Sequence, residues 1–93
     1  MSTRFKIVIP AYNAAAWIEK SLSSVESQTY KNYDVCVIDD ASTQEEQRQI
    51  IASFVERNGW KAIYNSTNCG ALENIVKGIK ALECADDDVI ITL

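Results

Sequence analysis

Apolar residues along this chain fall into four short runs, separated by three longer stretches in which they recur at helical spacing. The runs span 7–9, 33–39, 61–65 and 89–93. The first helical stretch spans 14–27, the second runs from the turn at 42–45 to about residue 57, and the third spans 71–83. Continuously apolar runs are typical of strands that are covered on both faces, as in a parallel sheet. The alternation predicts a three-layer α/β/α fold, in which helices cover both faces of a four-stranded parallel sheet.

The third run differs from the others because it is half polar, which places it at an edge of the sheet. The simplest strand order is therefore 3-2-1-4, which reverses between the first and fourth strands. In open parallel sheets, ligands bind at the carboxyl ends of the strands beside such a reversal. We expect Pro10 to end the first strand, since proline has no N–H for the ladder. The residues expected at the crevice are Pro10, Ala11, Tyr12 and Asn13.

Polar residues mark the expected ends of the helices. Asn13 is expected to cap the first helix, and Ser42 with Glu45 to form a capping box before the second. Gly59 is expected to end the second helix in a left-handed conformation. The predicted inward faces are Trp17, Ile18, Leu22 and Val25, then Ile50, Ile51, Phe54 and Val55, then Leu72, Ile75, Val76, Ile79 and Leu82.

Composition narrows the class of protein. The 93 residues make one small domain, and a net charge of −4 without a basic run argues against a nucleic-acid partner. The chain has no transmembrane-length apolar run and no signal-peptide core, so we expect it in the cytoplasm. Cys36, Cys69 and Cys84 have neither disulfide nor metal-site spacing and are expected to be reduced thiols. Histidine is absent, so acid–base or metal chemistry must rest on carboxylates.

Asp39 and Asp40 follow the second strand, at the edge where the crevice is expected. Because adjacent strand residues point to opposite faces, we expect one carboxylate to aim at the crevice and the other at a helix N-terminus or loop amide. The alternative is that 39–42 is only a helix-capping turn. The acidic run 86–88 lies at the amino end of the fourth strand and is expected to be a solvated turn.

Tyr12 is either a half-exposed turn aromatic or a plate for a nucleobase, which would contribute about 1–3 kcal/mol by stacking. A carboxylate that accepts an imide N–H would add about 1.5–3 kcal/mol. Together these features suit uracil or thymine, whose N3–H is a donor, rather than adenine. The chain contains neither G-x-G-x-x-G nor G-x-x-x-x-G-K-[ST], so neither NAD nor a P-loop nucleotide is indicated.

Motifs along the whole chain resemble those of the family 2 glycosyltransferases. They are Ile7-Val8-Ile9-Pro10-Ala11-Tyr12-Asn13, Ser21-Leu22 with Ser24-Val25, Gln28-Thr29-Tyr30, Val37-Ile38-Asp39-Asp40-Ala41-Ser42, and Asn68-Cys69-Gly70 with Asn74. The chain departs from the family pattern at Ala14, where many members have an acidic residue, and at Glu73, where an arginine is frequent.

The resemblance implies the GT-A fold, a nucleotide-sugar donor (commonly a UDP-sugar), inversion at the anomeric carbon and, in the full-length enzyme, a divalent metal, Mn or Mg. It implies that Asp40 bonds the uracil imide, with Asp39 close to the nucleoside. The remaining nucleotide-binding residues that it implies are Pro10, Ala11 and Tyr12 around the base, with Asn13 at the same exit, and Asn68, Gly70 and Asn74 in a segment passing close to the nucleotide.

By the same resemblance, residues 1–93 would be a single truncated domain, the nucleotide-sugar-binding portion of a longer protein. The metal motif and the general base would come after the fourth strand, so we expect no catalytic residue and no metal ligand in this chain. The parent enzyme would move a sugar from a nucleotide donor to an acceptor hydroxyl, in the cytoplasm or at the cytoplasmic membrane face.

Two further expectations concern the chain by itself. We expect it to be inactive alone and to self-associate through the unpaired edge of the strand 89–93, since such edges template association. The competing hypothesis is a non-catalytic α/β module that binds a nucleotide or a protein partner.

Overall fold

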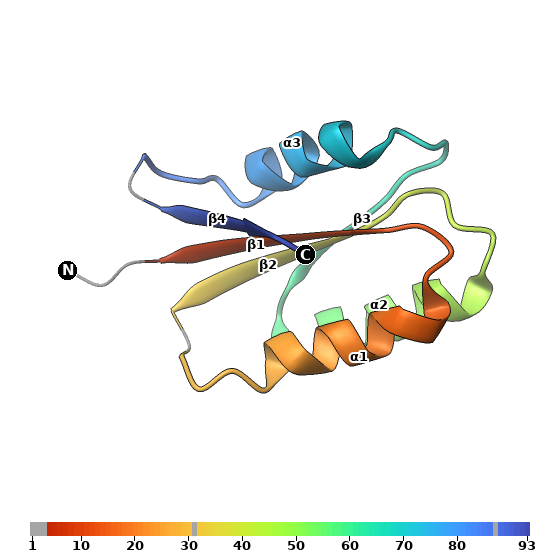
Figure 1. The fold of residues 1–93 in the computed structure, drawn as a ribbon, viewed down its shortest axis with the longest axis horizontal. Coiled ribbons are helices and arrows are strands. Elements are labelled where there is room, and N and C mark those ends of the chain that lie inside the picture. Colours follow the sequence, from red (N-terminus) through yellow and green to blue (C-terminus); the bar gives the residue numbers. More distant parts are fainter. Residues whose placement is uncertain (1–3, 31, 87) are drawn as a thin grey trace.

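The computed structural model describes residues 4–30, 32–86 and 88–93. Its elements are β1 (Phe5–Ala11), α1 (Ala15–Glu26), β2 (Tyr33–Asp39), α2 (Glu45–Asn58), β3 (Lys61–Tyr64), α3 (Ala71–Ala81) and β4 (Val89–Thr92). The strands form one parallel sheet in the order β3-β2-β1-β4. Figure 1 shows α1 and α2 on one face of the sheet and α3 on the other. The predicted three-layer fold and strand order are therefore confirmed.

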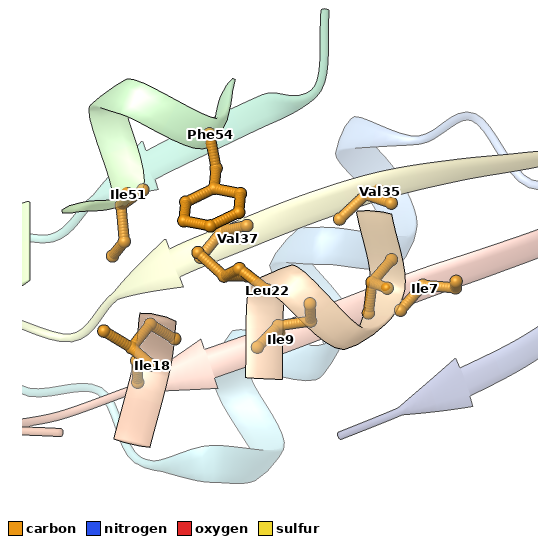
Figure 2. Close-up of a cluster of buried hydrophobic side chains, with 10 residues drawn as sticks. Ile7, Ile9, Ile18, Leu22, Val35, Val37, Ile51 and Phe54 are labelled. Atoms are coloured by element: carbon orange, nitrogen blue, oxygen red, sulfur yellow. The ribbon is translucent and has the colours of Figure 1, made fainter. Parts of the chain in front are cut away.

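Alternate residues of the two central strands pack against different helices. The cluster on the α1/α2 face contains Ile7, Ile9, Val35 and Val37 of the sheet with Ile18, Leu22, Ile51 and Phe54 of the helices (Figure 2). The cluster on the α3 face contains Val8, Cys36, Ile38 and Leu82. Each large aliphatic side chain buried in this way contributes about 1.5–3 kcal/mol. The same alternation fixes which face each side chain occupies where the strands end.

β1 runs to Ala11, beyond its predicted end, so Pro10 lies within the strand. The pairing of β1 with β4 ends at Val8, whereas its pairing with β2 continues to Ala11. Backbone groups alternate between the two neighbouring strands, and Ala11 O accepts a bond from the β2 side (Asp40 N, 2.9 Å). The nitrogen of Pro10 therefore faces the β4 side, beyond the last pair, where its missing N–H removes no ladder bond.

Three side chains that were expected to face inward are exposed. Trp17 of α1 is 72% exposed, and Leu72 and Val76 of α3 are 78% and 43% exposed. The buried residues of α3 and its end are Asn74, Gly78 and Leu82. This row of residues four apart is the face that packs on the sheet, which turns Leu72 and Val76 away from it.

β4 lies at the edge of the sheet that the predicted strand order gives it, but its side chains are not buried as its apolar run predicts. It pairs with β1 alone among the described strands and lies at one end of the sheet in Figure 1. Val89 and Ile90 are exposed, as is Leu93 just after the strand. An apolar run therefore indicated a strand here, but not coverage of both its faces.

The amino end of the sheet holds a buried charge that the hydrophobic pattern did not reveal. Lys6 of β1 donates to Asp34 Oδ2 (2.7 Å) and to Leu82 O (3.1 Å). Arg4 donates to both carboxylate oxygens of Asp34 (2.9 and 2.6 Å). The hydrogen bonding of Arg4, supported by Lys6, holds the pKa of Asp34 well below its usual range although burial opposes the shift.

The acidic run and the thiols have structural explanations. Asp86 is exposed, whereas Asp88 is half-buried and accepts a bond from Ala85 N (2.8 Å); Asp87 lies outside the described residues. The cysteines, Cys36, Cys69 and Cys84, are free thiols as predicted. Burial raises the pKa of Cys36 to about 11, so this thiol fills core volume and is poorly reactive.

Gly78 allows α3 to lie directly on β1. A Cβ at this position would be 2.5 Å from Val8 Cγ1 and 3.2 Å from Val8 Cβ. We expect Gly78→Ala to lower the free energy of unfolding by about 1 kcal/mol, because overpacking costs about 1–3 kcal/mol and alanine offsets about 1 kcal/mol through helix propensity. Urea unfolding followed by circular dichroism measures this difference.

The Val8→Ala background provides the control for that experiment, because it removes the methyl groups that the new Cβ would meet. There we expect Gly78→Ala to be neutral or to stabilise by up to about 1 kcal/mol. Lys80→Ala, at an exposed position of α3, should change stability by less than about 0.5 kcal/mol. If Gly78→Ala changes the free energy of unfolding equally in both backgrounds, the contact with the Val8 methyl groups is not the cause of the destabilisation.

Candidate functional site

Three strands end together at one edge of the sheet, and a side chain with polar atoms follows each of them. The register aligns Ala11 of β1, Asp39 of β2 and Tyr64 of β3. The residues that come next are Tyr12, Asp40 and Asn65. The strand order reverses beside β1, and the carboxyl ends of strands at such a reversal are the usual ligand site of an open parallel sheet. This edge is therefore the candidate site.

Asp40 is the centre of a buried hydrogen-bond network on the α3 face. Its Oδ1 accepts from Cys69 N (2.7 Å) and Asn65 Nδ2 (2.9 Å), and its Oδ2 accepts from Gly70 N (3.2 Å). Its backbone carbonyl accepts from Asn68 Nδ2 (2.6 Å). Gly70, with φ of +86°, is the N-cap of α3, so the carboxylate lies at the positive end of the helix dipole. One residue thus ties the end of β2 to the start of α3.

Asn65 connects Asp40 to the body of α3. Its Nδ2 also donates to Asn74 Oδ1 (2.7 Å), and its Oδ1 accepts from Lys77 Nζ (3.0 Å). Lys77 Nζ is 3.2 Å from Cys69 Sγ as well. Asn65 and Asn74 are buried, and within the described part of the chain every buried side-chain nitrogen and oxygen has a partner. The network is therefore complete, as buried polar groups require.

The network sets the charge of Asp40. Burial raises the pKa of this carboxyl group, but the hydrogen bonds that it accepts, led by that of the Cys69 amide, lower it more and bring it from 3.8 to about 2. Asp40 is consequently ionised at neutral pH and can act only as a hydrogen-bond acceptor.

Asp39 lies on the opposite face and organises the turn into α2. It accepts a bond from Gln47 Nε2, and its Oδ2 accepts from Ser42 N and Arg48 Nε, both at 3.3 Å. The strand alternation correctly predicts that Asp39 and Asp40 have different partners. Asp39, however, is completely buried. The sequence predicts that only one of the two carboxylates binds a neighbouring turn, whereas both carboxylates bind turns or side chains of the chain itself.

The two predicted N-terminal caps are wrong. Ala14 rather than Asn13 is the N-cap of α1, and Gln44 rather than Ser42 is the N-cap of α2, so the capping box of Ser42 and Glu45 is not formed. Asn13 has a φ of +48°. Its Oδ1 accepts from Ser42 Oγ (2.8 Å) and from the backbone N–H of Thr43 (2.9 Å). Asn13 therefore bridges the turns that follow β1 and β2.

Glutamine side chains of the α2 region bind the start of α1 in place of a local cap. Gln47 Oε1 accepts from Ala14 N (2.6 Å), and Gln44 Oε1 accepts from Ala15 N (2.9 Å). Gln47 Nε2 also donates to Ala11 O (3.2 Å). Gln47 is fully buried and was missed from the sequence, although it lies four residues before Ile51, on the inward row of the helix.

The three residues predicted to line a base present different groups. Tyr12 is 50% exposed and leaves the sheet beside Asp40, whose N–H donates to Ala11 O. Pro10 is half-buried and, by the strand alternation, belongs to the α3 face together with Asp40. Ala11 is buried in the α1/α2 cluster, so its side chain faces away from Asp40.

Apart from Pro10, Ala11 and Tyr12, the predicted site residues fall into two networks. Asp40, Asn68, Gly70 and Asn74 are joined on the α3 face, and Asn13 and Asp39 on the α1/α2 face. Asn65 and Lys77 were missed. Asn65 could have been suspected because it directly follows the third strand, and Lys77 because it lies three residues after Asn74 on the same helix.

The described residues contain no group of three or more histidine, cysteine, aspartate or glutamate side chains that could hold a metal ion. Asp39 and Asp40 are engaged by N–H donors, which leaves neither as an open oxygen ligand. At this edge, the described carboxylates therefore do not offer the open oxygen ligands that a divalent cation would need. In the part of the chain that the structure describes, no helix combines the length and the hydropathy needed to cross a membrane.

Comparison with known proteins gives consistent matches. The family model described as Glycosyl transferase family 2 matches residues 6–93. The amylovoran biosynthesis glycosyltransferase AmsB of Erwinia amylovora is 39% identical over 57 residues, which are 61% of this chain and 19% of that protein. The chain therefore spans about a fifth of that relative.

Two solved structures share the fold. S. aureus TarS 1-349 in complex with UDP-GlcNAc matches with a TM-score of 0.79 and 24% identity, over 98% of this chain and 26% of that one. The mannosyltransferase PcManGT from Pyrobaculum calidifontis, in complex with GDP-Man and Mn2+, matches with a TM-score of 0.76 and 20% identity, over 87% of this chain and 25% of that one.

The network around Asp40 predicts a pH-dependent effect of Asp40→Asn. At neutral pH we expect this substitution to lower the free energy of unfolding by about 1–3 kcal/mol, because buried donors lose a charged acceptor. The pKa of Asp40 is about 2 in the folded chain and 3.8 in the reference state. Its contribution to the free energy of unfolding is therefore fully present above pH 3.8 and is lost as the pH falls toward 2.

Urea unfolding of both proteins across this acidic range is the measurement. The difference in unfolding free energy should narrow as pH falls, whereas the exposed-site variant Asp86→Asn should remain close to the unsubstituted chain throughout. A difference between Asp40→Asn and the unsubstituted chain that is independent of pH would contradict the ionised, hydrogen-bonded state of Asp40.

Proposed function

We propose, given that this chain belongs to glycosyl transferase family 2, that it forms the nucleotide-binding part of an enzyme that moves a sugar from a UDP-sugar to an acceptor hydroxyl with inversion. The observation that carries the proposal is the ionised carboxylate of Asp40 at the edge where the strand order reverses, with its backbone bonded to Ala11, which the half-exposed Tyr12 follows. Stacking on an aromatic ring and acceptance of an imide N–H are the two contacts that this pair offers a nucleobase.

The hydrogen bonding of Asp40 differs between its two oxygens. A carboxylate has about four lone-pair positions. Oδ1 accepts from Cys69 N and Asn65 Nδ2 at 2.7 and 2.9 Å, Oδ2 accepts from Gly70 N at 3.2 Å, and the side chain of Asn74 also hydrogen-bonds the carboxylate. Because the bond from Gly70 N is the longest of these three distances, we assign the N3–H of uracil to Oδ2.

The charge of Asp40 also selects among bases. An ionised carboxylate attracts the imide N–H of uracil and the N1–H of guanine, but it faces an acceptor in adenine. The nucleotides in the TarS and PcManGT complexes, UDP-GlcNAc and GDP-Man, both present such a donor. We choose uracil for this chain because its single ring, unlike the two fused rings of guanine, matches the size of one tyrosine ring.

The chemistry of transfer is assigned to the whole enzyme. The described residues supply no metal site. We therefore propose that the divalent cation, Mn or Mg, and the base that activates the acceptor hydroxyl belong to parts of the enzyme that this chain does not include, and that the chain alone is inactive. Residues 1–93 are accordingly proposed to act as one nucleotide-sugar-binding domain, and the enzyme to act in the cytoplasm or at the cytoplasmic membrane face.

We predict that UDP binds this chain with a dissociation constant of about 1 mM or weaker, because stacking and one charged hydrogen bond give roughly 3–6 kcal/mol before the entropy of binding is subtracted. NMR titration with UDP should shift the amide signals of Tyr12 and Asp40 equally with and without manganese. ADP at the same concentration should produce much smaller shifts.

Two tyrosine variants complete that titration. Tyr12→Ala should lose the stacking contribution of about 1–3 kcal/mol and with it most of the UDP shifts. Tyr30→Ala, at the amino end of the sheet against Phe5, should leave them unchanged. Shifts confined to other parts of the molecule, or equal shifts with ADP, would favour the competing hypothesis of a non-catalytic module.

We also propose that the chain self-associates through the exposed edge of β4. Val89 and Ile90 present an apolar edge, and unpaired edges template pairing with another chain. Sedimentation equilibrium at millimolar concentration should detect dimers, and Ile90→Lys should reduce them because a charge on an edge strand opposes pairing. A strictly monomeric protein at that concentration would contradict this proposal.

A further inference from the structure

Asn65 hydrogen-bonds three residues at the site through its side chain, and the proposed function gives it no role of its own. Its backbone N–H donates to Asp39 O (2.9 Å) and so continues the β2–β3 ladder. Its side chain contacts three residues through Asp40 Oδ1 (2.9 Å), Asn74 Oδ1 (2.7 Å) and Lys77 Nζ (3.0 Å). The side chain is buried, so these contacts are shielded from water.

These contacts allow the amide of Asn65 only one orientation. Its Nδ2 faces two oxygens, Asp40 Oδ1 and Asn74 Oδ1, while its Oδ1 faces the ammonium of Lys77. A half-turn of the amide would place oxygen against both oxygens and nitrogen against the ammonium. Buried polar groups without partners are unfavourable, so the amide donates to Asp40 in a fixed direction.

The donated bond determines how the carboxylate of Asp40 is rotated. The amides of Cys69 and Gly70 reach one oxygen each, and together they hold the carboxylate near the loop. The side chain of Asn74 also hydrogen-bonds the carboxylate, and Asn65 adds a second donor to Oδ1, at 2.9 Å. Loss of this donor would leave the carboxylate attached to the loop but freer to rotate.

We propose that Asn65 is a positioning residue for base recognition: it anchors Oδ1 of Asp40 so that Oδ2 is presented to the imide of the base, and Lys77 fixes the amide of Asn65. This inference rests on the proposed function. Asn65 does not touch the nucleotide in this scheme, so its effect is on selectivity for the imide proton rather than on stacking or on the phosphates.

A pair of nucleotides separates positioning from general stability. UDP has the imide proton, whereas N3-methyl-UDP carries a methyl group in its place. The unsubstituted chain should bind UDP at least about tenfold more tightly than N3-methyl-UDP, since a hydrogen bond to a charged group is lost. In Asn65→Leu, the ratio of the dissociation constant for N3-methyl-UDP to that for UDP should fall toward one. The affinity for N3-methyl-UDP itself should change by less than about twofold. NMR titration measures both affinities.

Two further variants keep the test decisive. Lys77→Met removes the ammonium that fixes the amide, so it should reduce the ratio in part, and it stands in for Asn65→Leu if that variant does not fold. Asn58→Leu is the matched control, because Asn58 Nδ2 donates to Glu26 and to Phe54 O far from this network. Its ratio should equal that of the unsubstituted chain.

The outcomes separate the two hypotheses. If the unsubstituted chain binds neither nucleotide, the proposed function fails. If it binds both equally, the imide contact of Asp40 fails and the role of Asn65 fails with it. If it prefers UDP and the variants at 65 and 77 keep the full ratio, losing affinity for both nucleotides alike, Asn65 is merely structural and this inference is overturned while the proposed function stands.

Discussion

A carboxylate that must be surrounded by donors organises the carboxyl edge of this sheet. Asp40 is buried, and a buried ion is strongly unfavourable unless hydrogen bonds compensate for the lost water. The amides of Cys69 and Gly70 supply those bonds, which draws the start of α3 against the end of β2. The positive end of the helix dipole adds to the effect. The loop between β3 and α3 thereby receives a defined conformation.

The opposite face follows the same principle with different groups. Asp39 gathers the turn before α2, and Gln47 connects that turn to the end of β1 and the start of α1. Asp39, the last residue of β2, and Asp40, the residue after it, thus hold the helices on both faces of the sheet. The alternation of the strand sends their side chains apart, Asp39 to the α1/α2 face and Asp40 to the α3 face. The backbone N–H of Asp40 donates to the carbonyl of Ala11, the residue before Tyr12.

The layers, the strand order and the bounds of β2 could be predicted because the apolar periodicity reflects burial directly. The resemblance to family 2 glycosyltransferases is confirmed by the family model, which covers residues 6–93. Errors arose where a distant contact overrides a local preference. Asn13 is a good cap by residue type, yet its amide binds Ser42, 29 residues away. β4 lies at the edge that the strand order predicts, but its apolar run predicts burial, whereas Val89 and Ile90 are exposed.

The central claim is spatial: a uracil ring bound at this edge stacks on Tyr12 while its imide faces Asp40. Intermolecular NOEs between bound UDP and the isotope-labelled chain test this arrangement most directly, because they report proximity within a few ångströms of each ring proton. The account predicts NOEs from uracil H5 and H6 to the ring protons of Tyr12. NOEs from those protons to residues at the amino end of the sheet, with none to Tyr12, would contradict it.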